Sequence, residues 1–388
     1  MLAMIHGNRT RVENGMFRVD RKFHSGMSMY VKNIGVPIVS IHPESEPGEV
    51  TMDLIEVPCD ELGYQVITAK VDNRRRLVKG ELEKLYPKLK ECKLLYGHGL
   101  EIAELAKRLS IPFILVLEYD LSTHLTIARS AAPSFLRGIS RSVKEIFRYV
   151  GELPDFMNAA SLHCNGYPIF EATTRYNKRR LLYLDSRMGT DMVIKEEQLE
   201  ARLESLASGR TIRMLFSGRY EEAKGVLDVV RVALACLERG EDVELHCYGQ
   251  GSLRDEMCTL ANANPRIFIH DAIPYPELVE ISRTFDLFIC CHIQCDPSCT
   301  YLESFGAGLP IAGYDNLMWS GLRNASHAGV GVPISNAKLL SQEVQSLVRN
   351  PVRLASLSRA ARSFAASHAF EHEYQRRTDE INAFVQPA

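Results

Sequence analysis

Short apolar runs alternate with amphipathic segments along most of this chain, and this alternation limits its fold more than any other feature. In the first half, strands are expected at 36–43, 93–99 and 112–119. The stretch LEIAELAKRLS, between the last two strands, has apolar residues at helical spacing. Strand, helix and strand in succession are typical of a parallel sheet with helices on its faces. The chain is therefore expected to be an α/β protein with a doubly wound sheet.

The same alternation begins again at residue 211. Between the expected strands lie helical patterns such as VLDVVRVALACLERG and SLRDEMCTLANA. A chain of 388 residues is too long for one compact core, so two Rossmann-like domains are predicted. The strands of this half are expected in IRMLFSG, VELHCYG (243–249), RIFIHD (266–271), LFICCHI (287–293) and LPIAGYD (309–315).

The domain limits follow from composition. Residues 1–190 are predicted to form the first domain, in which MFRVDRKFHSGMSMY supplies a first strand, a loop at His24-Ser25-Gly26 and a helix. The charged stretch 191–210 is low in aromatic residues and is interpreted as the linker. Residues 211–365 are predicted to form the second domain. A helix over 366–388 is a candidate to pack back on the first domain. Closing strands of the first domain are expected in 157–166 and 181–188.

Composition excludes several classes of protein. A net charge of −2 gives no reason to expect a nucleic-acid partner. No apolar run of about 18 residues is present, so no membrane-spanning helix is expected. The N-terminus lacks the apolar region and cleavage site of a signal peptide, and the scattered cysteines fit buried thiols in a reducing cytosol. A cytoplasmic protein is therefore expected.

One cysteine cluster has the residue types of a zinc site: Cys290, Cys291, His292, Cys295 and Cys299. The spacing does not match a zinc knuckle, and neighbouring residues on a strand point to opposite faces. We therefore expect no metal site.

A glycine turn follows the first strand of the second half. Ser217-Gly218-Arg219 comes directly after the apolar run, and Lys224-Gly225 opens a helix-like stretch four residues later. Glycine lets the backbone approach phosphate oxygens closely, and helix N-terminal amides favour anions. Arg219 and Lys224 would neutralise a diphosphate. A surface loop that happens to carry an arginine and a lysine is the alternative.

Four segments of the second half follow one another in this order: SGRYEEAKG (217–225), CYGQGSLRDEM (247–257), IFIHDAIPYPELVEISRTFDLFIC (267–290) and CDPSCTYLESFGAGLPIAGYDN (295–316). Together they resemble the GT-B glycosyltransferases of retaining family 4 (glycosyl transferases group 1). The first is similar to the family's GR-four-residues-KG turn, and the other three are similar to its strand–GxG–helix, its Asp before a buried strand and its paired-acid block.

The resemblance implies roles for residues of the second domain. Gly218, Arg219 and Lys224 match the turn that holds the diphosphate of the donor, and both cations would act in catalysis. Glu303 matches the acid that binds the nucleotide ribose. Residues 270–274, with Ile273, fall where the family recognises the base. Three further residues at the start of the next helix would offer backbone amides to phosphate: Thr300, Tyr301 and Leu302.

The chain departs from the family pattern at the first acid of the paired-acid element. The residue at that position is Cys295, and Asp296 stands one position along. Either the loop shifts so that Asp296 reaches the donor sugar and serves in catalysis, or the contact is lost.

The first domain resembles the family in architecture only. His98 ends a strand and is a candidate donor contact, with a strand-end histidine of no role as the alternative. Glu118 ends the next strand and is a candidate base or sugar contact, with an ordinary strand-end acid as the alternative. Gly26 lies where the family has its glycine-rich first loop.

The stretch 134–151 puts apolar residues on one helical face and Arg137, Arg141, Lys144 and Arg148 on another. This pattern suits docking at an anionic membrane. The alternative is a half-buried helix with a solvated charged face.

The resemblance implies a cytoplasmic retaining glycosyltransferase, with possible peripheral contact at the inner membrane face. It would move a hexosyl unit from a nucleotide diphosphate sugar, with UDP or GDP as nucleotide, to a saccharide or lipid-linked saccharide acceptor. Polysaccharide assembly at the cell envelope or outside the cell is the implied setting. Neither a metal nor another cofactor is implied, and the oligomeric state stays open. Two alternatives stay open, a nucleotide-sugar epimerase of the same fold and a degenerate nucleotide-sugar-binding protein.

Overall fold

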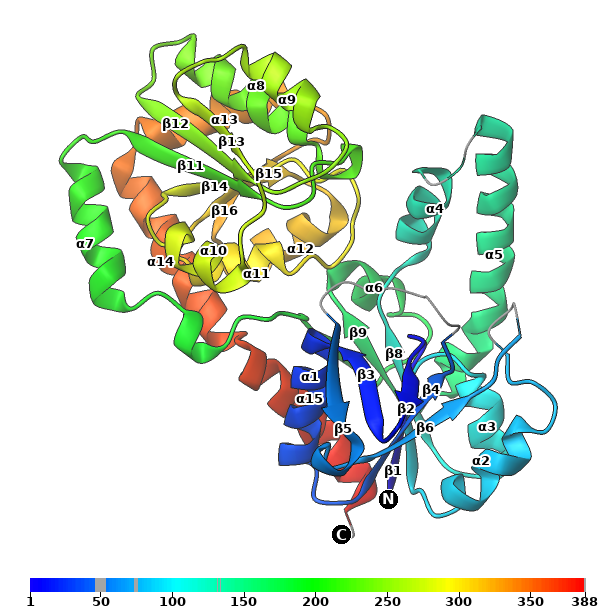
Figure 1. Ribbon diagram of the computed structural model, residues 1–388. Helices are drawn as coiled ribbons and strands as arrows, with labels where there is room; N and C mark the ends of the chain where they lie inside the picture. Colours follow the sequence, from blue (N-terminus) through cyan, green and yellow to red (C-terminus); the bar gives the residue numbers. More distant parts are fainter. Residues whose placement is uncertain (46–53, 73–75, 131, 133, 387–388) are drawn as a thin grey trace. The chain divides into compact units, whose positions relative to one another are not determined.

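The computed structural model describes residues 1–386 except 46–53, 73–75, 131 and 133. The chain divides into two compact units (Figure 1). The N-terminal unit contains residues 1–121, 142–183 and 371–388, and the C-terminal unit contains 122–141 and 184–370. The last segment of the chain therefore belongs to the N-terminal unit.

The N-terminal unit is built on a parallel sheet of order β10-β9-β8-β7-β1-β4-β6. Short strands with consecutive buried residues are typical of a sheet that is covered on both faces. Its strands are β1 (Leu2–Ile5), β4 (Ile38–Pro43), β6 (Gln65–Ala69), β7 (Leu94–Gly97), β8 (Phe113–Leu117), β9 (Ser161–Asn165) and β10 (Arg180–Tyr183).

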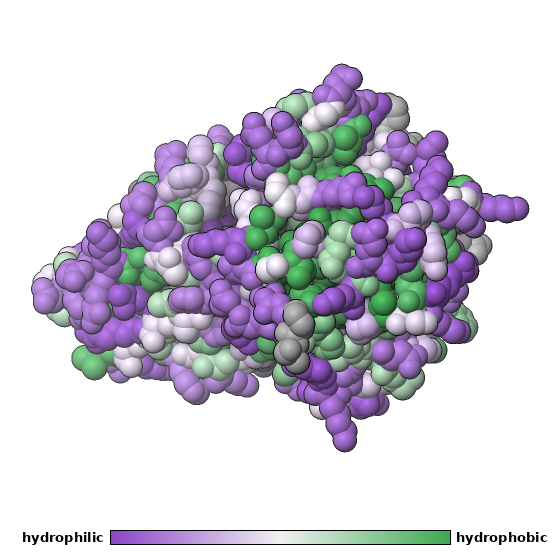
Figure 2. All heavy atoms as spheres, turned by 90° about the horizontal axis from the view of Figure 1, so that it is seen from below, coloured by the Kyte–Doolittle hydropathy of each residue, from purple (hydrophilic) through white to green (hydrophobic). Residues whose placement is uncertain are grey.

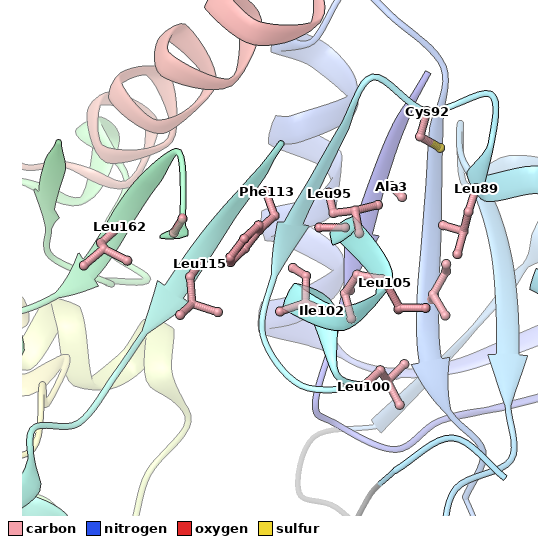
Figure 3. Packing of buried hydrophobic residues seen from close by; sticks show 14 of the residues in the cluster. Ala3, Leu89, Cys92, Leu95, Leu100, Ile102, Leu105, Phe113, Leu115 and Leu162 are labelled. Atoms are coloured by element: carbon pink, nitrogen blue, oxygen red, sulfur yellow. The ribbon is translucent and has the colours of Figure 1, made fainter. Parts of the chain in front are cut away.

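Successive residues of β7 face opposite layers of this unit. Leu95 packs in a hydrophobic cluster with residues of α2 (Glu81–Leu89), α3 (Ile102–Leu109), α5 (Phe135–Asn158) and α6 (Tyr167–Ala172) (Figure 3). Tyr96 faces the other layer, where its hydroxyl lies 2.9 Å from that of Tyr30 on α1 (Arg21–Asn33). The ring of Tyr374, on α15 (Phe370–Val385), packs against Tyr30 as well. The alternation of side chains along a strand thus gives the sheet two cores. Helix α4 (Leu121–Ser130), from residue 122 onward, and the first residues of α5, up to Arg141, belong to the C-terminal unit.

The expected first strand and loop of this unit are placed differently in the structure. The first strand of the parallel sheet is the fully buried β1, and the run MFRVD forms β3 (Met16–Asp20) of a small antiparallel sheet with β2 (Arg11–Glu13) and β5 (Leu54–Pro58). Residues 24–26 are not a loop but the middle of α1, which begins where the Asp20 carboxylate accepts from the amide of Phe23. A Cβ on Gly26 would lie 2.1 Å from the hydroxyl of Tyr374, so this glycine serves helix packing.

The C-terminal unit has a second parallel sheet, of order β13-β12-β11-β14-β15-β16. Helices α8, α9 and α13 cover one face, and α10, α11, α12 and α14 cover the other (Figure 1). The strands are β11 (Ile212–Ser217), β12 (Val243–Tyr248), β13 (Ile267–His270), β14 (Leu287–Cys290), β15 (Ile311–Tyr314) and β16 (Gly329–Val332). The helices are α7 (Glu196–Ala207), α8 (Val226–Leu237), α9 (Arg254–Ala261), α10 (Tyr275–Ser282), α11 (Thr300–Gly306), α12 (Leu317–Ser326), α13 (Ala337–Val348) and α14 (Pro351–Ser367). Short 3-10 turns are found at Cys59–Glu61, Thr190–Met192 and Glu222–Lys224.

The stretch 191–210 is not a bare linker, because most of it forms α7, which packs on α14 within the C-terminal unit. The guanidinium of Arg202 is buried and donates to three backbone carbonyls, those of Arg283 (3.0 Å), Ala307 (2.8 Å) and Gly308 (2.7 Å). Composition alone suggests a linker, because the exposed face of α7 is rich in charged residues. The buried face carries Leu199, Leu203 and Leu206.

Candidate functional site

In the C-terminal sheet, the order in which successive strands are added reverses between β11 and β14, and the loops that follow these two strands contact each other there. Strand β11 has β12 on one side and β14 on the other, so the loops after β11 and β14 meet at a topological switch point. The amide of Ile293 donates to the carbonyl of Ala223 at 3.0 Å. A Cβ on Gly225 would lie 2.0 Å from the carbonyl oxygen of Cys291. In open α/β sheets, ligands bind at such a place.

The turn after β11 is interlocked with the turn after β12. Gly218 has φ of 152°, a value that L side chains rarely adopt. A Cβ on Gly249 would lie 1.9 Å from the carbonyl oxygen of Gly218. The buried Tyr220 hydroxyl donates to the carbonyls of Cys247 (2.8 Å) and His270 (2.7 Å). The two glycine turns and the C-terminal end of β13 are therefore held together at the carboxyl ends of the strands.

The two cations of the glycine turn have different surroundings. Lys224 is 7 % exposed, and its ammonium donates to the carboxylate of Asp296 at 3.0 Å. Arg219 is 58 % exposed and pairs with Glu221 at 3.0 Å. Each cation thus has an acidic partner, and the two pairs differ in burial, with the Lys224 ammonium in a medium of lower dielectric than the Arg219 guanidinium.

Asp296 thus lies beside Lys224, although the family pattern places its acid one residue earlier. The backbone turn is closed by the amide of Ser298, which donates to the carbonyl of Asp296 at 2.8 Å. The sequence left open whether Asp296 reaches the donor sugar. The structure places its carboxylate beside Lys224, at the same loop junction.

Glu303, the expected ribose acid, has an arginine partner. Arg187 donates from Nη2 (3.0 Å) and Nε (3.2 Å) to Oε1 of Glu303. The guanidinium also lies over the ring of Tyr275, 4.1 Å from its centroid. The carboxylate that would accept from ribose hydroxyls is therefore occupied by a cation from residue 187. Sequence reasoning missed both residues: Arg187 lies outside the four segments that resemble the family, and Tyr275 lies inside the segment 267–290 but was given no role there.

The start of α11 matches its expected position. Thr300 is the first residue of the helix, and Tyr301 and Leu302 have buried side chains. The Tyr301 hydroxyl accepts from Nδ2 of Asn316 at 3.2 Å, so Tyr301 and Leu302 could meet an anion only through their backbone. Ile273 lies between β13 and α10 and is half-buried.

His292 is a buried polar side chain next to this site. It follows β14, its ring packs edge-on against Tyr301, and neither ring nitrogen has a hydrogen-bond partner among the described residues. Burial, together with the Lys224 ammonium, holds the pKa of His292 well below its usual range. The ring is therefore neutral at physiological pH. Sequence reasoning considered His292 only as a possible zinc ligand.

The candidates of the N-terminal unit follow its parallel strands. His98, after β7, is exposed and packs over Gly7, where a Cβ would lie 2.7 Å from its Nε2. Glu118, after β8, is exposed. Two histidines that the sequence did not single out lie at the same sheet: the rings of His6 and His42 are stacked at 4.5 Å. Burial lowers the pKa of His42 to about 3.

In the part of the chain that the structure describes, no three histidine, cysteine, aspartate or glutamate side chains gather as metal ligands would. All ten cysteines are free thiols. Cys290 and Cys291 are buried, and burial raises the pKa of the Cys290 thiol to about 11.

Solved structures with the same arrangement of elements define the class of the fold. The Anabaena protein HepE in complex with UDP has 10% identity and a TM-score of 0.65, with 98% of this chain and 99% of that chain covered. The sucrose-phosphate synthase of Thermosynechococcus elongatus has 13% identity and a TM-score of 0.64, with 98% of both chains covered. WaaG, a glycosyltransferase involved in lipopolysaccharide biosynthesis, has 12% identity and a TM-score of 0.60, with 100% of both covered. These likenesses show the GT-B fold, two Rossmann-like domains.

Residues 198–364 match the family described as "Glycosyl transferases group 1". The matched segment contains the glycine turn, Lys224, Asp296 and Glu303. No curated protein matches the chain. Together with the fold, the family match supports a glycosyltransferase.

Proposed function

We propose that this protein is a retaining glycosyltransferase of family 4 that transfers a hexosyl unit from a nucleotide diphosphate sugar to a hydroxyl acceptor. The observation that carries the proposal is the buried Lys224 ammonium. It lies at the topological switch point of the C-terminal sheet, inside the segment that matches the family. A cation of this kind stabilises the negative charge that grows on a departing diphosphate.

Each residue of the C-terminal site has a proposed task. Lys224 and the exposed Arg219 neutralise the diphosphate, and the backbone at Gly218 and at residues 300–302 approaches its oxygens. Glu303 exchanges Arg187 for the ribose hydroxyls. Asp296 holds Lys224 in place and contacts the donor sugar. The residues around Ile273 recognise the base.

The reaction needs no divalent metal in this proposal, because protein cations and backbone dipoles supply the electrostatic stabilisation. Glu118 and His98, at the strand ends of the N-terminal unit, are proposed to contact the sugar or the acceptor, with Glu118 as the candidate base. UDP or GDP is the proposed nucleotide. Binding of UDP by HepE is one observation in favour of UDP.

The acceptor is proposed to be a saccharide or a lipid-linked saccharide in polysaccharide assembly, which would take place in the cytoplasm. The role of WaaG in lipopolysaccharide biosynthesis supports this setting by analogy.

The test is a thermal-shift panel of UDP-, GDP-, ADP- and TDP-sugars, followed by a turnover assay with the sugar that binds. Ligand at 100 times its dissociation constant should add about 2.7 kcal/mol to the free energy of unfolding. Turnover should depend on an added acceptor and persist in EDTA. Epimerisation without acceptor would identify the enzyme as an epimerase of this fold, and binding with no turnover for any donor and acceptor would identify a binding protein. A lack of any shift would overturn the proposal.

A further inference from the structure

Helix α5 carries a large apolar surface that the protein does not cover. In the view of Figure 2, hydrophilic residues form most of the projecting surface and hydrophobic residues lie mostly between them. On α5, Phe135 is 82 % exposed, Leu136 76 % and Phe147 74 %. Ile139, Val143, Ile146 and Val150 are exposed as well. A contiguous exposed surface of large apolar side chains marks an interaction site. These seven residues are called the α5 apolar stripe below.

The helix has three distinct arcs. With 3.6 residues per turn, the α5 apolar stripe fills an arc of about 120°. The second arc holds four cations, and the third is buried. Tyr149 and Phe156 of the third arc belong to the core of the N-terminal unit, so α5 is attached through this arc while the stripe stays outside. The cations are Arg137, Arg141, Lys144 and Arg148.

The charge of the second arc is not uniform. Arg148 forms ion pairs with Glu145 and Glu152 of the same helix. Its charge is therefore neutralised locally. The other three cations of this arc, Arg137, Arg141 and Lys144, have exposed side chains.

We propose that α5 docks on an anionic lipid surface, with the α5 apolar stripe inserted at the acyl boundary and its cations at the headgroups. A helix with an exposed apolar arc beside a basic arc fits an interface that is apolar in depth and negative at its surface. A second copy of this chain fits less well, because a symmetric pairing of two stripes would bring two sets of cations together. No described helix combines the length and apolar character needed to cross a bilayer. The inference does not depend on the proposed reaction.

The experiment measures binding of the whole protein, without any sugar donor, to phosphatidylcholine vesicles with and without phosphatidylglycerol. Wild type should bind only the anionic vesicles and should be released as salt rises. Each cation near such a surface contributes about fivefold to partitioning, so changing Arg137, Arg141 and Lys144 to Gln should lower it by about a hundredfold. The matched control changes the exposed Lys88, Lys90 and Lys107 to Gln, which removes the same charge elsewhere and should leave binding unchanged.

The apolar part is tested with Leu136→Ser combined with Phe147→Ser, which should abolish binding, against Val352→Ser, an equally exposed apolar residue on α14. Phe147→Trp gives a direct readout, because the one native tryptophan, Trp319, is buried. Its fluorescence should shift to the blue when anionic vesicles are added. Circular dichroism checks that each variant is folded.

Three results would overturn the proposal. The first is equal binding of wild type and the triple Gln variant to anionic vesicles. The second is no blue shift of Phe147→Trp. The third is self-association of wild type, seen by light scattering, that Leu136→Ser with Phe147→Ser abolishes while no vesicle binding is seen.

Discussion

Breaking the pair between Lys224 and Asp296 should lower both stability and turnover. A fully buried ion pair that loses one partner costs about 3–5 kcal/mol, and an exposed pair contributes about 0–1 kcal/mol. With Lys224 7 % exposed and Asp296 20 % exposed, this pair lies between the two cases. Lys224→Met and Asp296→Asn should therefore each lower the free energy of unfolding by about 2 kcal/mol.

The double variant closes a thermodynamic cycle. Since the two side chains are in contact, their effects on unfolding should not add, and a coupling of at least about 1 kcal/mol is expected. Denaturant unfolding without ligand measures all four proteins. A coupling below about 0.5 kcal/mol would show that the contact adds nothing in solution.

Turnover separates the structural part of this pair from the catalytic part. Lys224→Met should reduce turnover at least a hundredfold, the usual effect of removing one donor that stabilises a developing anion. Arg219→Ala is the matched control: its exposed side chain should leave stability unchanged within about 0.5 kcal/mol, although turnover falls as well. If Lys224→Met were destabilised but as active as wild type, Lys224 would be a structural residue and the assignment of the diphosphate site would be refuted.

Three other predictions concern the Arg187–Glu303 pair, His292 and Arg202. Glu303→Gln should weaken binding of the free nucleotide diphosphate, and Arg187→Gln should tighten it by about fivefold, because a half-exposed ion pair worth about 1 kcal/mol no longer competes for the carboxylate. Calorimetry measures both affinities. Weaker binding by Arg187→Gln would mean that the guanidinium contacts the nucleotide. Burial lowers the pKa of His292 in the folded protein, so below a pH of about 6.5 the unfolded chain binds a proton that the folded protein does not. The contribution of His292 to the free energy of unfolding is therefore fully present above this pH and is lost as the pH falls below it. His292→Leu should reduce this loss by up to about 1.4 kcal/mol per pH unit in urea titrations, and an unchanged pH slope would contradict the assignment. Arg202→Met should lower the free energy of unfolding by about 3–5 kcal/mol, because three buried carbonyls lose a charged donor. Thermal unfolding measures this, and a variant as stable as wild type would mean that α7 contributes little packing and acts as a linker.

Much of the architecture was predictable because it is encoded locally. The strands β4, β7 and β8 of the N-terminal unit and β11 to β15 of the C-terminal unit lie inside the predicted runs. A buried parallel strand needs only a short apolar run, and that signal is carried by neighbouring residues. The glycine turn could be predicted for the same reason, because the positive φ angles of Gly218 and Gly225 belong to a turn that a few neighbouring residues determine.

Errors arose where a local pattern has two tertiary outcomes. Gly26 marks a loop in one fold and a close helix contact in another, and only the position of Tyr374 decides between them. The charged stretch 191–210 is compatible with a solvated linker, and the buried carbonyls around Arg202 make it a packed helix instead. The run MFRVD forms β3, which pairs with β5 in the small antiparallel sheet and is not part of the parallel sheet.

By itself, the sequence determined the α/β class, the two parallel sheets and the glycine turn at the end of β11, because periodicity and backbone conformation are properties of adjacent residues. The tertiary structure alone decided which charges meet. Arg187 and Glu303 are 116 positions apart, and Lys224 and Asp296 are 72 apart, so no local pattern contains either pair. It also decided that the α5 apolar stripe is exposed, since the same amphipathic pattern fits a helix that covers a sheet. Contacts between distant segments depend on how complete elements pack, and for this reason the partners of the site residues came only from the folded chain.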